Sequence, residues 1–309
     1  MQSISLGDTI SITPCLREFK RIYPEVALDV LTSCPDVFKY NPHVRNVIPK
    51  YDGQKQEILT QYDWDVSPFQ AFEFKRFPLH MLTHSVDFVS YGMFQRMLRP
   101  DQKHYYVPYT YIEESGMERK CKKAGIDFNK PCILIHPHDS YWETRSWGHQ
   151  NWSMLVDLIR AKNENYQIIS IGGDRNLSKI KQQKMNNYVE IKNIIDLYNK
   201  LSVLETIALM DQSEILISMD TGVIHMAAAT NIKILGIFSV VHSSYRLPYR
   251  DGIFGKDCYP IDSEECDCNS KRKFITNEKT TISKCKYEYK PLKCMPSVQK
   301  VYFKFLEAM

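Results

Sequence analysis

The residues best suited to chemistry lie in the stretch from Glu214 to Ser239. Asp220, Thr221 and Gly222 follow the short apolar run EILISM, and His225 comes three residues later. Gly222 gives the backbone room to turn, and a helix that opens here would direct free backbone N–H groups and the positive end of its dipole outward. Such a turn is a ready binding site for an anion such as phosphate. The alternative is an ordinary strand-to-helix turn in which Asp220 caps the helix.

The elements on either side of this turn are predicted to be buried strands. EILISM (214–219) and KILGIF (233–238) are short β-branched apolar runs, which are typical of parallel strands covered on both faces. A short helix between them would carry His225 in its first turn. The turn would then lie at the carboxyl end of a strand, where open parallel sheets bind their ligands.

The rest of the C-terminal half repeats this alternation. CILIHP (132–137) and YQIISIGG (166–173) predict strands, VEIKNII (189–195) predicts a weaker one, and Ser202 with Glu205 forms the capping-box pattern that opens the helix VLETIALMDQ. The helix after the first of these strands has an apolar face made by Trp152, Leu155, Val156 and Ile159. The pattern predicts a Rossmann-like parallel sheet.

The N-terminal half is also an α/β pattern. TISITPCLREFKRIYP reads as a helix with Asp8 placed to cap it, and ALDVLT, VRNVIP and YDWDVS read as strands. Only SIS precedes the opening loop, so either the first strand is very short or residues are missing before it. We place the domain boundary near Asp127 to Pro131, which gives domains of 1–128 and 129–309. The chain closes with a helix, PSVQKVYFKFLEAM.

Other candidate residues follow the predicted strands of the C-terminal half. His136 ends one strand, Gly172 and Gly173 end another and would let a nucleotide approach the backbone closely, and Arg145 lies in a loop where it could neutralise a diphosphate. Each has a plainer explanation: two glycines also suit a simple turn, and a loop arginine is often only solvated.

Two further groups contain residue types that can bind a metal ion, but neither is a convincing metal site. Asp63-Trp64-Asp65 has the form of a metal-binding DxD but lies in an alternating strand. The C-terminal cysteines lack the paired spacing of common structural zinc sites, so zinc, a disulfide and reduced thiols all stay open, with reduced thiols the simplest interpretation. These cysteines are Cys266, Cys268, Cys285 and Cys294.

Composition fits an ordinary globular protein. Of the 309 residues 43% are hydrophobic and 25% are charged, and the formal charge of +4 suits an anionic substrate without indicating nucleic acid. No apolar run approaches the length of a membrane span, and nine cysteines without a secretory signal favour a cytoplasmic protein. The segment from Gln70 to Tyr111 is rich in aromatic and basic residues, typical either of helix anchors or of a surface resting on lipid headgroups.

Taken together, these segments resemble the heptosyltransferases of lipopolysaccharide core synthesis, glycosyltransferase family 9. The resemblance covers most of the chain through SLGDTISITPCLREFKRIYP, YDWDV, IHPHDSYWETRSWGHQNWSMLVDLI and IGGD, and is strongest in LSVLETIALMDQSEILISMDTGVIHMAAATNIKILGIFS. It implies a GT-B fold, in which two Rossmann-like domains face a cleft and the C-terminal helix returns toward the N-terminal domain. The N-terminal domain would hold the acceptor, and the C-terminal domain the nucleotide sugar.

The resemblance also implies roles for individual residues. Asp8 would be the general base that deprotonates the acceptor hydroxyl as the sugar is transferred with inversion, and Arg145 would stabilise the leaving nucleotide diphosphate. No metal or other cofactor is implied. The donor site would contain His136, Arg145, Gly172, Gly173, Asp220, Thr221, Gly222 and His225.

Three hypotheses for function follow. The first is an inverting glycosyltransferase that moves a sugar, expected to be heptose from an ADP-linked donor, to lipopolysaccharide or another surface glycan. The second is a protein that binds a nucleotide sugar or glycan without turnover, and the third is a GT-B nucleotide-sugar epimerase. The expected partners are a nucleotide sugar and a glycan or lipid-linked glycan, with no nucleic acid. The expected location is the cytoplasm, with peripheral contact at the inner face of the membrane left open.

Overall fold

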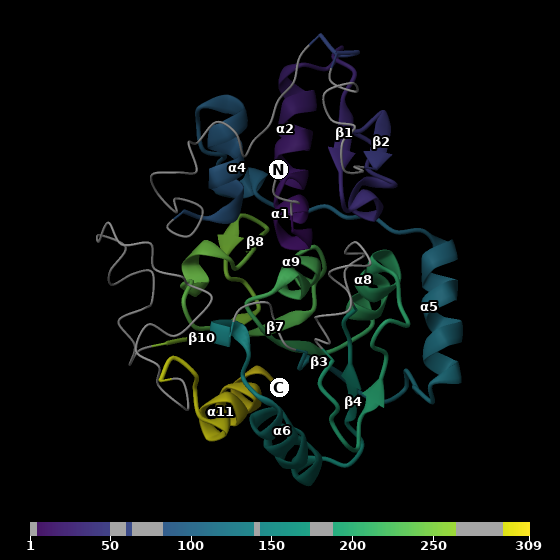
Figure 1. Ribbon diagram of the computed structural model, residues 1–309, viewed down its shortest axis with the longest axis vertical. Coiled ribbons are helices and arrows are strands. Elements are labelled where there is room, and N and C mark those ends of the chain that lie inside the picture. Colours follow the sequence, from purple (N-terminus) through teal and green to yellow (C-terminus); the bar gives the residue numbers. More distant parts are fainter. Residues whose placement is uncertain (1–4, 50–59, 64–82, 139–142, 174–187, 264–292) are drawn as a thin grey trace. The chain divides into compact units, whose positions relative to one another are not determined.

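The computed structural model describes residues 5–49, 60–63, 83–138, 143–173, 188–263 and 293–309 (Figure 1). Its contacts divide the chain into two compact units. Unit 1 comprises Met1–Pro108 and Ser244–Lys256, and unit 2 comprises Tyr109–Ser243 and Asp257–Met309. This division differs from the expected boundary at 128/129 because helix α5 (Tyr111–Lys123) packs on helix α8 (Val203–Asp211) of unit 2.

Unit 2 contains a six-stranded parallel sheet of order β10-β7-β6-β3-β4-β5. The sequence order β3, β4, β5, β6, β7, β10 gives the arrangement 3-2-1-4-5-6 of the Rossmann fold, as predicted. The sequence analysis did not identify β10, which pairs along its whole length with β7. The strands are β3 (Cys132–His136), β4 (Gln167–Ser170), β5 (Ile195–Asp196), β6 (Ile215–Met219), β7 (Lys233–Phe238) and β10 (Cys258–Asp262).

Helices cover both faces of this sheet, which is why its strands are apolar throughout (Figure 1). Helices α6 (His149–Lys162) and α11 (Val298–Ala308) pack together on one face, while α8 and α9 (Gly222–Ala228) lie on the other. Alternate strand residues supply the two cores. The core on the first face includes Ile133, Ile135, Ile215, Ile217, Leu235, Ile237, Trp152, Leu155, Val156, Ile159, Val301 and Phe305.

The position of the last helix corrects one expectation. Helix α11 was expected to return toward the N-terminal domain, but it packs against α6, β7 and β10 of unit 2. Val301 and Phe305 are fully buried in that core, so the apolar face of the helix is already used there. The segment that does return to unit 1 is Ser244–Lys256, which carries the hairpin β8 (Tyr249–Arg250) and β9 (Ile253–Phe254).

Unit 1 begins with two successive helices, α1 (Leu6–Ser11) and α2 (Thr13–Ile22). They are followed by the parallel pair β1 (Asp29–Thr32) and β2 (Asn46–Pro49), with the short helix η1 (Pro35–Phe38) between them. Helix α4 (Ser85–Phe94) packs on α1 and α2, and the turn η3 (Pro100–Gln102) contacts β8 and β9. The strands predicted in ALDVLT and VRNVIP are confirmed, whereas most of YDWDVS lies outside the described residues.

Asp29 joins β1 to the start of β2. Its carboxylate accepts hydrogen bonds from Arg45 Nε at 2.8 Å and Nη2 at 2.7 Å, and from the hydroxyl of Tyr62 at 2.9 Å. The Arg45 guanidinium therefore holds the pKa of Asp29 well below its usual range.

A buried ion pair fastens the returning segment to unit 1. Lys103 Nζ lies 2.7 Å from Asp87 Oδ2, with side chains 7% and 10% exposed, and 4.6 Å from the centre of the Tyr249 ring. His84 caps α4 and its Nε2–H donates to the carbonyl of Leu247 at 2.9 Å. Burial lowers the pKa of His84 to about 4, so the imidazole is neutral near pH 7 as this bond requires.

Replacing Lys103 with methionine is expected to lower the free energy of unfolding by about 3–5 kcal/mol, because it leaves the Asp87 carboxylate buried without its cation. Denaturant unfolding followed by circular dichroism measures this. The double variant Lys103→Met, Asp87→Leu removes both charges and should recover most of the loss. A single variant as stable as the wild type would show that the pair does not hold the segment.

Candidate functional site

The site lies where the strand order of unit 2 reverses, between β3 and β6. In open α/β sheets the crevice at the carboxyl ends of the two central strands binds the ligand. His136 ends β3 and pairs in register with Ser218 of β6, and Asp220 follows β6 directly. The parallel sheet therefore brings together two predicted site residues that are 84 positions apart in the sequence.

The turn after β6 forms as predicted, with two corrections of detail. Thr221, not Asp220, caps helix α9, and its Oγ1 accepts from the N–H of Val223. His225 is buried in the last turn of this seven-residue helix rather than in its first. The N–H of Asp220 donates to the carbonyl of Ile237 at 3.1 Å, which holds the turn against β7 and leaves the Asp220 side chain to other partners.

Arg145 forms an ion pair with Asp220. Its Nη2 lies 2.8 Å from Asp220 Oδ2, with side chains 19% and 5% exposed. A charge pair so far removed from water interacts strongly, and the contact fixes a guanidinium beside the turn. Because a guanidinium has five N–H donors, it can contact a carboxylate and a phosphate at the same time. The arrangement suits an anionic ligand at the carboxyl end of β6.

Three contacts that the sequence analysis missed position Arg145. It ends the short helix η4 (Glu143–Arg145), whose Thr144 carbonyl accepts a hydrogen bond from Ser239 Oγ just after β7. Trp147 Nε1–H donates to the carbonyl of Pro296 at 2.9 Å, and its ring packs edge-on against Trp152 at 5.0 Å. Ser239 and Pro296 are distant in sequence from this loop, so no local pattern indicated their contacts.

His136 and the two glycines form the wall beside this turn. Burial and the neighbouring His138 lower the pKa of His136 to about 3, so its ring is neutral near pH 7. Among the described residues, its buried Nδ1 has no hydrogen-bond partner, which suits a polar ligand. Gly172 has a φ of +147°, and a Cβ there would lie 2.7 Å from His138 Cδ2. Gly173 would similarly meet the Asn199 side chain at 2.9 Å.

His138 fastens this wall and was not predicted. Its Nδ1 accepts from the N–H of Val189 at 3.2 Å, so its Nε2 carries the proton that faces Ser170 Oγ at 3.0 Å. The centre of its ring lies 4.2 Å from that of Tyr198, and the ring stacks on Tyr188 with 5.5 Å between the ring centres. His138 therefore links the loop after β3, the end of β4 and the segment around β5. In the sequence, only its position two residues after His136 could have indicated that His138 lies near the site.

Asp8, the predicted base, belongs to unit 1. The sequence placed it as the cap of the first helix, but Ser5 is the cap and Asp8 is the third helical residue. The N–H of Asp8 donates to Ser5 Oγ and the N–H of Ser5 donates back to Asp8 Oδ2, both at 3.2 Å, and Ser5 Oγ–H also donates to Asp8 Oδ2 at 2.7 Å. This capping box fixes the carboxylate at the start of α1 while the residue stays exposed.

Within the described ranges, no three His, Cys, Asp or Glu side chains form a group that could hold a metal ion. Trp64, Asp65, Cys266, Cys268 and Cys285 lie outside those ranges, and so do residues 70–82 of the aromatic and basic segment that begins at Gln70. The expectation that no metal is needed stays a prediction. None of the helices in the described ranges has the length and apolar character needed to cross a membrane.

The fold and site define an α/β domain in which a guanidinium is fixed at the switch point of a Rossmann sheet. A family model described as glycosyltransferase family 9 (heptosyltransferase) matches residues 83–256. This match covers more than half of the chain, so the chain belongs to this family of glycosyltransferases. No curated protein sequence matches it significantly.

Several solved structures share the fold. A family 9 glycosyl transferase from Veillonella parvula has a TM-score of 0.70 at 15% identity, over 99% of this chain and 95% of its own. The ADP-heptose lipopolysaccharide heptosyltransferase II of Escherichia coli has a TM-score of 0.61 at 13% identity, over 99% and 96%. The E. coli glycosyltransferase TibC has a TM-score of 0.64 at 14% identity, over 99% and 76%. The GT-B fold expected from the sequence is confirmed by these likenesses.

Replacing Gly172 with alanine is expected to destabilise unit 2 and to weaken nucleotide binding, because the new Cβ would collide with His138 in a backbone conformation that alanine rarely adopts. Gly125→Ala is the matched control, since Gly125 also has a positive φ but no atom within 4 Å of the added Cβ. Thermal melting should show a loss of about 1–2 kcal/mol for the control and more for Gly172→Ala. Equal losses would show that the contact with His138 is unimportant.

Proposed function

We propose that this protein is an inverting glycosyltransferase that moves heptose from ADP-heptose to a lipopolysaccharide or another surface glycan. The observation that carries the proposal is the ion pair between Arg145 and Asp220 at the switch point of the sheet. It keeps a cation beside the turn where a diphosphate would bind, in a chain that belongs to glycosyltransferase family 9. The names of two similar structures support this donor: one is an ADP-heptose heptosyltransferase, and TibC was solved with ADP-D-β-D-heptose.

The donor would bind to unit 2. Arg145 would contact the diphosphate and stabilise the negative charge that develops as the nucleotide leaves, and Asp220 would hold its guanidinium in place. Thr221, Gly222 and His225 would surround the phosphate and sugar. The neutral ring of His136 would accept the nucleoside without adding charge, and Gly172 and Gly173 would line this part of the site while allowing His138 and Asn199 to pack against their backbone. No metal would be required, because arginine supplies the positive charge.

The acceptor would react through Asp8. The acceptor hydroxyl oxygen would form the new bond to the anomeric carbon while the bond from that carbon to the diphosphate oxygen breaks, which inverts the configuration. The proton released by the hydroxyl would pass to the Asp8 carboxylate. The contact from Ser5 leaves room for this role, since an ionised carboxylate accepts at about four positions. A lipid-linked acceptor would bring the protein to the inner face of the membrane from the cytoplasm.

The choice of donor can be tested by thermal shift with ADP-, UDP-, GDP- and CMP-linked sugars. ADP-heptose at a hundred times its Kd should stabilise the protein by roughly 2.7 kcal/mol, and an Arg145→Gln variant should lose this shift. Adding EDTA should leave both the shift and transfer unchanged. A melting temperature unmoved by every nucleotide sugar would contradict the donor site, and loss of transfer in EDTA would contradict a metal-free reaction.

The role of Asp8 can be separated from its part in the capping box. Asp8→Asn keeps a hydrogen-bond acceptor but cannot take up the proton, so kcat should fall by about 10²–10⁴ while donor binding stays intact. Ser5→Ala is the matched control: it removes the cap and costs about 1 kcal/mol of stability but keeps the carboxylate. It should retain most transfer activity. Transfer unchanged in Asp8→Asn would exclude Asp8 as the base, and an equal loss in Ser5→Ala would assign the effect of both variants to the start of the helix and not to proton transfer.

A further inference from the structure

Unit 1 has a basic groove that the proposed transfer reaction does not use. It has a volume of about 480 Å³ and lies between helix α2, the loop before β2 and the turn η3. We call it the Glu18 groove, after the carboxylate at its base. The residues that line it are Arg17, Glu18, Lys20, Arg21, His43, Arg99, Asp101 and Gln102.

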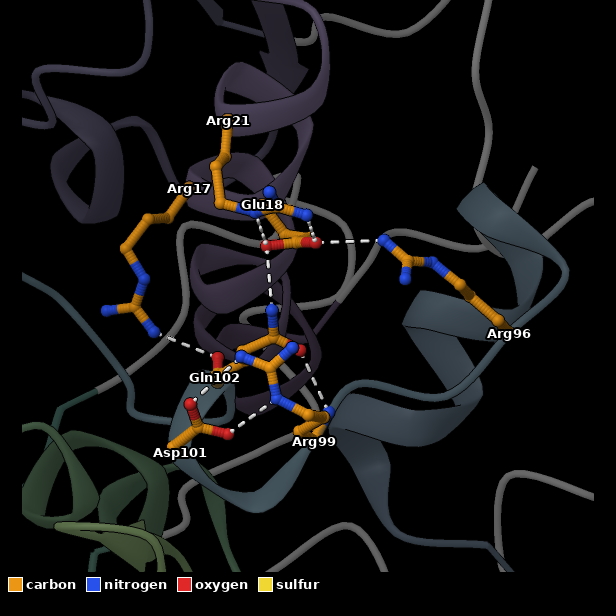
Figure 2. Close-up of polar contacts among 7 residues, drawn as sticks. All are labelled: Arg17, Glu18, Arg21, Arg96, Arg99, Asp101 and Gln102. Atoms are coloured by element: carbon orange, nitrogen blue, oxygen red, sulfur yellow. Dashed lines mark hydrogen bonds and ion pairs between the residues drawn. The ribbon is translucent and has the colours of Figure 1, made fainter.

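Glu18 organises this groove (Figure 2). Its side chain is 4% exposed and accepts from Arg21 Nε at 2.8 Å and Nη2 at 2.7 Å, from Arg96 Nη2 at 2.9 Å and from Gln102 Nε2 at 3.1 Å. Arg21 is the main reason that the pKa of Glu18 is lowered, so the carboxylate is ionised. A carboxylate accepts about four hydrogen bonds, and all four positions are occupied here. Glu18 thus holds two arginines in place, and its carboxylate has no acceptor position left for a further donor.

The groove keeps an excess of positive charge. Arg99 donates from Nε to Asp101 Oδ1 at 3.2 Å and from Nη2 to Asp101 Oδ2 at 3.1 Å. The Asp101 carboxylate therefore compensates the charge of Arg99. The charged residues of the cluster are five cations, Arg17, Lys20, Arg21, Arg96 and Arg99, and two anions, Glu18 and Asp101. Three positive charges are therefore left over.

Arg17 and His43 show that donors are available in the groove. Within the described residues, Arg17 uses its Nη2 to reach the carbonyl of Gln102 at 2.8 Å, which engages one of its five N–H donors (Figure 2). Burial, Arg17 and Lys20 together lower the pKa of His43, so this imidazole adds a neutral polar group beside the cations. A bound anion would reverse that effect, because negative charge favours the imidazolium.

We propose that the Glu18 groove is a second ligand site, which binds a phosphate group carried by a small molecule or a lipid headgroup. Guanidinium groups held at fixed positions match the oxygens of phosphate and bind it through paired, charge-assisted hydrogen bonds. The groove is built from residues of unit 1 and the donor turn from residues of unit 2, so the two share no side chain. The groove is also separate from Asp8, since Arg17 follows nine residues further along α1 and α2, a rise of roughly 13 Å.

The ring signals of His43, assigned with a His43→Gln variant, provide a reporter for this groove alone. Inorganic phosphate added to the full chain at constant ionic strength should shift these signals and raise the pKa of His43. The variant Arg17→Gln, Arg99→Gln should weaken this response by about ten-fold or more, because it removes two guanidinium forks. The matched control is Arg119→Gln, Arg160→Gln, which removes the same charge from exposed helix positions of unit 2 and should respond like the wild type.

A second measurement distinguishes a lipid headgroup from a soluble phosphate compound as the ligand of the groove. Sedimentation with vesicles of phosphatidylcholine, with and without phosphatidylglycerol, identifies a lipid headgroup if binding needs the anionic lipid and the groove arginines. A response to inorganic phosphate without such vesicle binding identifies a soluble phosphate compound. The proposal is overturned if inorganic phosphate leaves the His43 signals unchanged and vesicle binding does not depend on the groove arginines, or if the groove variant responds to phosphate like its control. ADP-heptose binding is expected to be unchanged in the groove variant, so failure of the donor assignment would be seen separately.

Discussion

The contact between Arg145 and Asp220 holds two charges largely away from water, and the donor site that we propose depends on its geometry. Such a pair is stable only where both partners are held in register. The sheet holds Asp220 through its N–H bond to Ile237. Ser239 and Trp147 hold the loop that carries Arg145. The apolar layers on both faces of the sheet thus serve the chemistry, because they fix the ends of β3, β6 and β7 where these groups meet.

The two units use charge in different ways. In unit 2 a neutral histidine and two closely packed glycines lie at the carboxyl ends of the strands, where one guanidinium is paired with the Asp220 carboxylate. In unit 1 the Glu18 groove gathers several cations around one saturated carboxylate. The first arrangement fits the donor of a family 9 glycosyltransferase. The second takes no part in the proposed transfer reaction and is the basis of the second, phosphate-binding site that we propose.

Local patterns identified most of the elements because the apolar periodicity of this chain is strong. The strands β3, β4, β6 and β7 and the helices α6 and α8 follow from it, including the capping box of Ser202 and Glu205. Strand β10 was missed because its run, with Pro260 at its centre, has no such periodicity and is a strand through its pairing with β7. The cap of the first helix was misplaced by three residues since both Ser5 and Asp8 are good capping residues, and their reciprocal bonds decide between them.

The sequence by itself determined the class of fold and the turn from Asp220 to Gly222, because these depend on short-range spacing, and its segments carried the resemblance that indicated the family. Only the tertiary structure decided that Arg145 pairs with Asp220, that His138 fastens the glycine wall and that α11 belongs to unit 2. The same holds for the Glu18 groove, whose arginines come from α2 and from a segment some eighty residues later. Each of these depends on groups that are far apart in the chain and become neighbours only when the apolar faces pack. Such contacts cannot be predicted from the spacing of residues along the sequence.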